Sequence, residues 1–246
     1  MKYLILSDIH SNYEALKSVF ASVKRKHFDL TLMLGDLVGY GASPNQVVNI
    51  IRSLKNTVVI RGNHDKVAAG LESGNNFNRP ASISAKWTYE KLTQINRNYL
   101  RKLIRGPLKI NDHVSIAHGS PLNEDDYIFS EFDALEVFYN TTAPIIFFGH
   151  THYPIIYSFS NNIITAMRVQ DVKQTYALNK NTRYLINPGS IGQPRDRHPY
   201  ASYAVWDSEK WKVTLYRISY DISSAQQRII KAGLPSSLAA RLSLGV

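Results

Sequence analysis

The chain has 246 residues, no cysteine and a formal net charge of +10. The absence of cysteine excludes disulfide bonds and thiolate ligands, so any metal ion must be bound by oxygen and imidazole nitrogen. The first apolar run, residues 3–6, is too short for a signal peptide, and no later segment approaches the roughly 18 apolar residues of a membrane span. We therefore expect a cytoplasmic protein without a membrane contact.

The excess of lysine and arginine favours anionic partners, because a positive field raises the local concentration of phosphate-bearing ligands. Nucleotides and nucleic acids both meet that description. The only tight basic run, residues 24–26, falls at the end of a predicted helix. The same charge is also typical of basic residues spread over a solvated surface.

Strands and helices alternate along the first third of the chain. Residues 3–6 and 30–34 are short apolar runs that predict buried strands. Between them, Ser11 and Glu14 have the spacing of a capping box and are followed by apolar residues at helical spacing, so a helix is expected from about residue 12. This order indicates a largely parallel sheet.

The pattern repeats once more before residue 65. Ser43 and Pro44 predict an N-cap and first helical position, and residues 58–60 predict a third strand. The three strands thus end just before Asp8, Asp36 and Asn63. Ligands of open α/β sheets bind beyond the carboxyl ends of the strands, which makes this edge the expected site.

The rest of the chain has a different pattern. Residues 80–105 are helical and amphipathic, with buried positions expected at Trp87, Leu92, Ile95, Leu100 and Leu103. Short strands are expected from there on, at 107–110, 114–117, 145–148, 155–159, 201–206 and 211–217, with helices near 133–139 and 224–231. We predict an α/β fold of two packed β-sheets flanked by helices. It forms one domain over residues 1–246, with a helical insertion at about 80–105.

Five polar segments follow apolar runs and contain five of the eight histidines. They are Asp8-Ile9-His10, Gly35-Asp36, Gly62-Asn63-His64-Asp65, His118-Gly119 and Gly149-His150-Thr151-His152. Residues i and i+2 of an extended chain project to the same side, so the outer residues of the first and last segments can each reach one pocket. A single segment of this kind most often marks a turn, but five of them indicate a metal site.

This ordered set resembles the motif series of the calcineurin-like metallophosphoesterase superfamily. The opening segment, residues 7–12, and the later segment, residues 187–196, are similar to its small single-domain bacterial and archaeal branch. The resemblance covers residues 3–206 and implies the four-layer α/β/β/α sandwich of that superfamily. Residues 70–110 contain no family motif.

The resemblance implies a binuclear metal centre. Asp8, His10 and His152 would bind one ion, Asn63, His118 and His150 the other, and Asp36 both. Such a pair of ions activates a bridging hydroxide and clamps the oxygens of an in-line displacement at phosphorus. Nitrogen and oxygen donors suit Mn²⁺, our first choice, or iron, cobalt, nickel or zinc.

His64 is implied to be the catalytic acid that protonates the leaving-group oxygen, a role that suits an imidazole near neutral pH. Asp65 either orients His64 or caps the next helix. The arginine that protein phosphatases of the superfamily carry after Gly-Asp is absent from residues 35–41. Phosphate contacts are expected instead from Asn12 at a helix N-terminus or from Arg195, and Tyr40 is a candidate to stack on a base.

We therefore predict hydrolysis of a nucleotide-like phosphodiester or a dinucleoside polyphosphate. The segment around Tyr40 resembles a subgroup of the branch that cleaves dinucleoside polyphosphates. The alternatives are a general phosphodiesterase or phosphomonoesterase and a serine/threonine phosphoprotein phosphatase. A nuclease and a silent binding scaffold are less favoured, because the chain lacks a basic patch with interleaved aromatics and retains every ligand position. The sequence does not indicate an oligomeric state.

Overall fold

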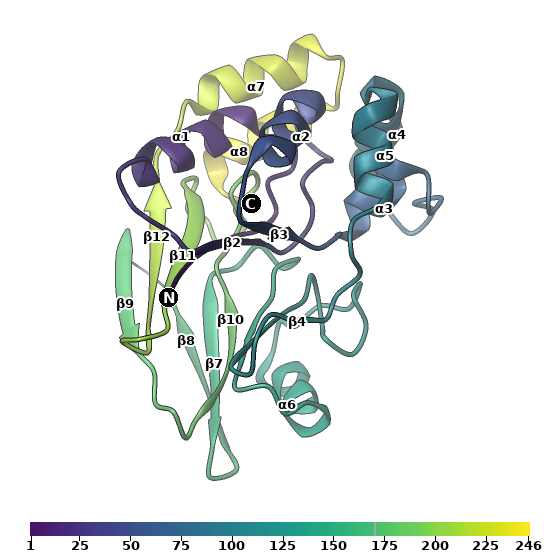
Figure 1. Ribbon diagram of the computed structural model, residues 1–246. Coiled ribbons are helices and arrows are strands. Elements are labelled where there is room, and N and C mark those ends of the chain that lie inside the picture. The colour runs from purple at the N-terminus through teal and green to yellow at the C-terminus, as the bar shows by residue number, and fades with distance from the viewer. Residues whose placement is uncertain (170) are drawn as a thin grey trace.

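Two six-stranded sheets form the centre of the computed structural model, which describes residues 1–169 and 171–246 (Figure 1). The strands of the first sheet are, in spatial order, β3 (Thr57–Val59), β2 (Leu30–Met33), β1 (Lys2–Leu6), β11 (Ala201–Asp207), β12 (Lys212–Ile218) and β9 (Lys173–Ala177). Those of the second are β4 (Leu108–Lys109), β5 (Val114–Ile116), β6 (Ile145–Phe147), β10 (Arg183–Asn187), β7 (Ile155–Ser160) and β8 (Ile163–Arg168). Both sheets are mixed. The strands β1, β2 and β3 are parallel to one another, as are β5, β6 and β10, and the remaining pairs are antiparallel.

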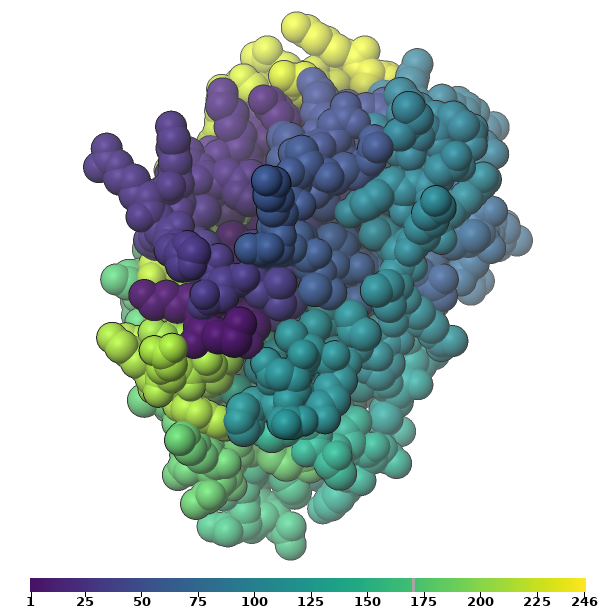
Figure 2. Space-filling model, in the orientation of Figure 1, coloured from purple at the N-terminus to yellow at the C-terminus, as the bar shows by residue number. Residues whose placement is uncertain are grey.

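The helices cover the outer faces of the two sheets. They are α1 (Tyr13–Val23), α2 (Pro44–Ser53), α3 (Asn63–Ala69), α4 (Arg79–Lys91), α5 (Gln94–Arg101), α6 (Glu131–Asn140), α7 (Ile222–Lys231) and α8 (Ser236–Leu244). Figure 2 shows the first helices, in purple and blue, in contact with the yellow C-terminal helices at the top of the molecule. None of these helices, over the described residues, has both the length and the apolar character needed to cross a bilayer.

Alternation along β1 explains the layers. Tyr3 and Ile5 pack into a core between the two sheets, whereas Leu4 and Leu6 face the helices α1 and α2. A third apolar cluster lies between the second sheet and α6, where Phe138 stacks on Phe159 with ring centroids 5.2 Å apart. The architecture is therefore the predicted four-layer α/β/β/α sandwich.

Most of the predicted elements are present, with local corrections. The first helix is capped by Asn12, whose Oδ1 accepts from the Ala15 amide at 3.1 Å, and Ser11 takes no part in the expected capping box. Ile95 was expected inside but is 64% exposed. The strands β8, β9 and β10 and the helices α3 and α8 were not predicted.

Candidate metal centre

The predicted ligands lie in loops at the carboxyl ends of neighbouring strands. Asp8 and His10 follow β1, Asp36 follows β2, and the two histidines of the Gly149 segment follow β6. These five residues, Asp8, His10, Asp36, His150 and His152, have φ values of 53°, 48°, 53°, 64° and 64°. Left-handed backbone at a residue other than glycine costs about 1–3 kcal/mol and is concentrated at functional sites. The backbone of these loops is thus strained at the residues whose side chains are candidate ligands.

Glycine is required where these loops touch. A Cβ atom on Gly149 would lie 2.0 Å from Ser7 Oγ and 2.8 Å from Asp8 Oδ2. Ser7 Oγ donates to the same Oδ2 at 2.6 Å, and the His150 amide donates to it at 3.1 Å. One oxygen of Asp8 is therefore fixed by the protein, and Oδ1 has no hydrogen-bond partner among the described residues.

His10 and His152 face each other with their Nε2 atoms 3.0 Å apart. His10 Nδ1 lies 3.1 Å from the Val38 carbonyl oxygen, and His152 Nδ1 lies 2.6 Å from that of Gln193. A carbonyl oxygen only accepts, so each Nδ1 carries the proton and each neutral ring directs an Nε2 lone pair at the other. Two facing lone pairs repel. A cation bound by both Nε2 atoms would remove that repulsion. Asp8 Oδ1, which lies 3.3 Å from His152 Nε2, is close enough to bind the same cation.

Asp36 lies between this group and a second one. Its Oδ2 has no hydrogen-bond partner in the described chain and lies 3.6 Å from His10 Nε2 and 3.5 Å from His118 Nε2. His118 Nδ1 donates to the Leu34 carbonyl at 2.8 Å, and its Nε2 lies 3.2 Å from Asn63 Oδ1. The carboxylate of Asp36 is thus within reach of both groups of donors.

His150 belongs to the second group. Its Nε2 donates to the Asp125 carbonyl oxygen at 3.1 Å, so Nδ1 is the nitrogen left to bind a cation. Ligand atoms of Asp36, His118 and His150 all lie within 4.8 Å of one another, as do those of Asp8, His10 and His152. The donors are oxygen and imidazole nitrogen, and their unpartnered atoms fit two cations.

Burial and charge set the protonation of these groups. Burial acts to raise the pKa of Asp8 and Asp36, but the neighbouring histidines, led by His152 and His118 respectively, hold both pKa values below their ordinary range. Burial lowers the pKa of His150 to about 3, and His118 adds to that effect. Burial also acts to lower the pKa of His118, but Asp36 raises it to about 10.

His64 lines a cavity of about 100 Å³ beside the two groups. Its ring is 4.4 Å from that of Tyr40 and 4.5 Å from that of Phe77, and its Nδ1 is buried without a partner among the described residues. Its backbone amide donates to Asp36 Oδ1 at 2.9 Å. Burial lowers the pKa of His64 to about 4, against the opposing effect of Asp36. Ligand atoms of His10, Asp36 and His64 form a third group within 4.8 Å, so His64 is also close enough to meet a cation.

Asp65 does not contact His64 through a hydrogen bond. Its Oδ2 accepts from the Gly62 amide at 3.0 Å and its Oδ1 from the Val38 amide at 3.2 Å. Burial, followed by the charge of Asp36, raises the pKa of Asp65 to about 7. Asp65 thus joins the start of α3 to the loop after β2, which corresponds to the capping role.

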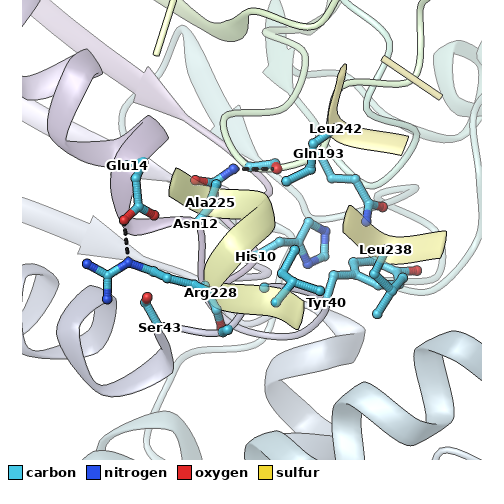
Figure 3. Close-up of a pocket in the computed structure, with 15 residues that line it drawn as sticks. His10, Asn12, Glu14, Tyr40, Ser43, Gln193, Ala225, Arg228, Leu238 and Leu242 are labelled. Carbon is cyan, nitrogen blue, oxygen red and sulfur yellow. Dashed lines mark hydrogen bonds and ion pairs between the residues drawn. The ribbon is translucent and has the colours of Figure 1, made fainter. Parts of the chain in front are cut away.

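Two of the three expected substrate contacts line the same cavity as His64. Tyr40 is 7% exposed, and Arg195 Nη2 donates to its hydroxyl at 3.3 Å. Asn12 does not line that cavity, because its Oδ1 caps α1 and its Nδ2 donates to the Gly192 carbonyl at 2.9 Å. It lies in a separate pocket of about 10 Å³ under α7 and α8, where Figure 3 shows it beside His10 and Tyr40. That pocket has room for about one water molecule.

The cavity wall also contains residues that no motif indicated. Asn76, Phe77 and Asn78 precede α4 and line it, and Tyr127 stacks on His150 with ring centroids 3.9 Å apart. Of the expected helical insertion at 80–105, Ala81 lines the cavity. Apart from the aromatic character of Phe77 and Tyr127, these residues carried no sequence signal.

Comparisons with known proteins identify the family. The family described as calcineurin-like phosphoesterase matches residues 1–154. An uncharacterised protein of Methanocaldococcus jannaschii is 36% identical over 98% of this chain and 97% of its own length. The crystal structure of a metallophosphoesterase from Sphaerobacter thermophilus is 35% identical, covers 100% of this chain and 99% of its own, and superposes with a TM-score of 0.87.

A more distant match is the symmetrical bis(5'-nucleosyl)-tetraphosphatase of Sodalis glossinidius. It is 35% identical over 82 residues, which are 32% of this chain and 29% of that protein. The family match, the full-length relatives and the buried groups of candidate ligands agree with one another. The chain belongs to the calcineurin-like phosphoesterases, a family of divalent-metal-dependent hydrolases that act on ester bonds.

Proposed function

We propose that this protein hydrolyses a nucleotide-like phosphodiester or a dinucleoside polyphosphate with the aid of two divalent ions. In this proposal Asp8, His10 and His152 hold one ion. Asn63, His118 and His150 hold the other, and Asp36 contacts both. Mn²⁺ is the expected metal, because the donors combine carboxylate, amide oxygen and imidazole.

One observation carries the proposal, namely the facing Nε2 atoms of His10 and His152 at 3.0 Å. Neither ring can turn its proton inward without giving up the bond from its Nδ1 to a carbonyl oxygen. Buried polar atoms without partners are rare in folded proteins, and here Asp8 Oδ1 and Asp36 Oδ2 are two more at the same place. A pair of cations accounts for all of them.

Bound ions would supply positive charge to the phosphate oxygens and lower the pKa of the attacking water. The residues of the chain then bind and orient the ester. Arg195 lines the cavity and offers a cation to a phosphate oxygen. His64 lines the same cavity, and we assign to it the donation of a proton to the leaving oxygen, which requires the charge of the bound phosphate to offset the lowering of its pKa by burial. Tyr40 and Phe77 hold the His64 ring between them and keep bulk water from it.

The nucleotide part of the proposal has separate support. The relative from Sodalis glossinidius carries the name of a dinucleoside tetraphosphatase. Aromatic side chains stand beside the candidate centre, and Tyr127 is 46% exposed there. A nucleobase that stacks on an aromatic side chain contributes about 1–3 kcal/mol. Tyr40 is buried at 7% exposure, so Tyr127 is the more accessible of the two to a base, although its ring already stacks on His150 and Phe129.

The test combines metal content with a choice of substrates. Freshly purified protein should contain close to two equivalents of a divalent metal and hydrolyse diadenosine tetraphosphate more efficiently than bis(p-nitrophenyl) phosphate. Turnover of the synthetic ester alone would refute the nucleotide assignment and leave a general phosphodiesterase. Release of phosphate from phosphopeptides alone would favour a phosphoprotein phosphatase.

Variants separate the proposed roles. His64→Ala should keep the metal and lose about 10²–10⁴-fold in turnover, the usual contribution of a proton donor. Asp36→Asn should lose metal as well as activity. His27→Ala is the matched control, because this side chain is 88% exposed and outside the cavity. Unchanged turnover in His64→Ala would remove His64 from the reaction.

A further inference from the structure

A second, larger cavity lies next to the candidate metal centre. It has a volume of about 630 Å³, within the usual range of roughly 300–1,000 Å³ for small-molecule sites. Thr151, which stands between His150 and His152, is part of its wall, and so is Asp196, the neighbour of Arg195. Neighbouring residues of the same loops thus line the two cavities.

A row of aromatic rings leads from one cavity to the other. Tyr127 stacks on His150 with centroids 3.9 Å apart and rings inclined by 18°. Phe129 stacks on Tyr127 at 5.0 Å and 16°, and Tyr153 meets Phe129 edge to face at 6.2 Å and 79°. Phe129 and Tyr153 line the larger cavity and are 56% and 43% exposed. Flat apolar surface of this kind, left open beside a polar site, suits a planar ring.

The same cavity is positively charged. Arg168, Arg197 and Arg217 line it against one acidic residue, Asp196. Asp196 is paired with Arg217 at 2.6 Å, and Arg168 and Arg197 have no carboxylate within ion-pair distance in the described part of the chain. Burial lowers the pKa of His198, and the charge of Arg217 adds to that effect. Two arginines are therefore available to an anion.

Aromatic faces and unpaired arginines together select a ligand that is both planar and anionic. A lipid tail would leave the arginines unused, and a simple phosphate would leave the rings uncovered. We infer that this cavity binds the nucleotide part of the substrate, with the base on Phe129 and Tyr153 and a further phosphate near Arg168 and Arg197. The inference rests on the proposed function, because it assigns the non-reacting end of the same ester to a place beside the metals.

The first test compares two substrates in variants outside the catalytic cavity. Phe129→Ala should lower kcat/KM for diadenosine tetraphosphate by about 10-fold, the equivalent of one lost stacking contact. Turnover of bis(p-nitrophenyl) phosphate should stay within about twofold, because that ester does not need the second cavity. Arg168→Ala should behave in the same way. Phe132→Ala is the matched control, since Phe132 is 84% exposed and lines neither cavity.

The second test measures binding without turnover. Adenosine 5'-monophosphate should bind to the EDTA-treated protein, and Phe129→Ala should raise its Kd by about 10-fold while Phe132→Ala leaves it unchanged. This readout stands even if the protein hydrolyses neither ester, a result that would refute the proposed function alone. An equal loss on both substrates, no change on either, or the same Kd in Phe129→Ala and wild type would overturn the assignment of the cavity.

Discussion

Lys66 is a buried cation next to the candidate centre, and its replacement by methionine should destabilise the fold around His150. The side chain of Lys66 is 2% exposed, and its Nζ lies 2.6 Å from Asp125 Oδ2, 3.0 Å from Glu72 Oε1 and 3.4 Å from Glu124 Oε1. The Asp125 carbonyl oxygen in turn accepts from His150 Nε2 at 3.1 Å. The ion pairs of Lys66 therefore fix the turn that orients His150.

The expected loss of unfolding free energy depends on how each carboxylate is solvated once its ion pair with Lys66 is removed. Asp125 and Glu72 are 43% and 49% exposed, so water can solvate them and each pair contributes about 0.2–1 kcal/mol. Glu124 is only 7% exposed but keeps Arg61 at 2.8 Å, so it is not left as an isolated buried charge. Methionine retains most of the apolar stem. We expect a loss of about 2 kcal/mol, which lowers the Tm of a chain of this size by about 4–8 °C.

Urea unfolding of the EDTA-treated proteins measures this difference, with Lys17→Met on the exposed face of α1 as control. The difference in unfolding free energy between wild type and Lys66→Met should become smaller in acid. Burial acts to raise the pKa of Glu124, but Arg61 and Lys66 hold it below its ordinary 4.5. The stability from these pairs is thus present above that value and lost as the pH falls through the lowered pKa. Equal stability of Lys66→Met and Lys17→Met near neutral pH would refute this reasoning.

Three further predictions concern the candidate centre. Two ions at about 100 times their Kd add about 2.7 kcal/mol each, so EDTA should lower the Tm by about 10–20 °C in differential scanning calorimetry. Gly39→Ala would bring a Cβ to 2.5 Å from His64 Nδ1 at a φ of +92°, and should reduce turnover at least about 10-fold with little loss of metal. Arg195→Gln should raise KM for anionic esters while metal analysis finds the same content. The first prediction would be contradicted by an unchanged Tm after EDTA treatment. Normal turnover in Gly39→Ala would contradict the second, and an unchanged KM in Arg195→Gln the third.

The strands β1 and β2 could be predicted from the sequence because burial makes them short apolar runs, whereas the equally central and buried β10 was missed. The candidate ligands follow those runs directly, so a local pattern was enough to find them. The strands β8 and β9 lie at sheet edges and are half exposed, which removes the apolar signal that a predictor needs. The single-domain organisation remains a prediction.

Contacts between distant segments could not be predicted in this way. The helix α5 buries Asn96 rather than Ile95, because the Asn96 amide donates to Asn45 and Asn49 at 2.9 Å each. A prediction from helical periodicity assumes that the buried face of a helix is apolar. In α5 that face includes Asn96, which makes polar contacts with α2. Phe77 and Tyr127 likewise reach the candidate centre only through the folding of long loops.

The most direct test of the account is diffraction from crystals soaked in Mn²⁺, recorded where manganese scatters anomalously. We predict two peaks, one against Asp8, His10 and His152 and the other against Asn63, His118 and His150, with Asp36 in contact with both. A single peak elsewhere, or no peak between the facing Nε2 atoms of His10 and His152, would contradict it.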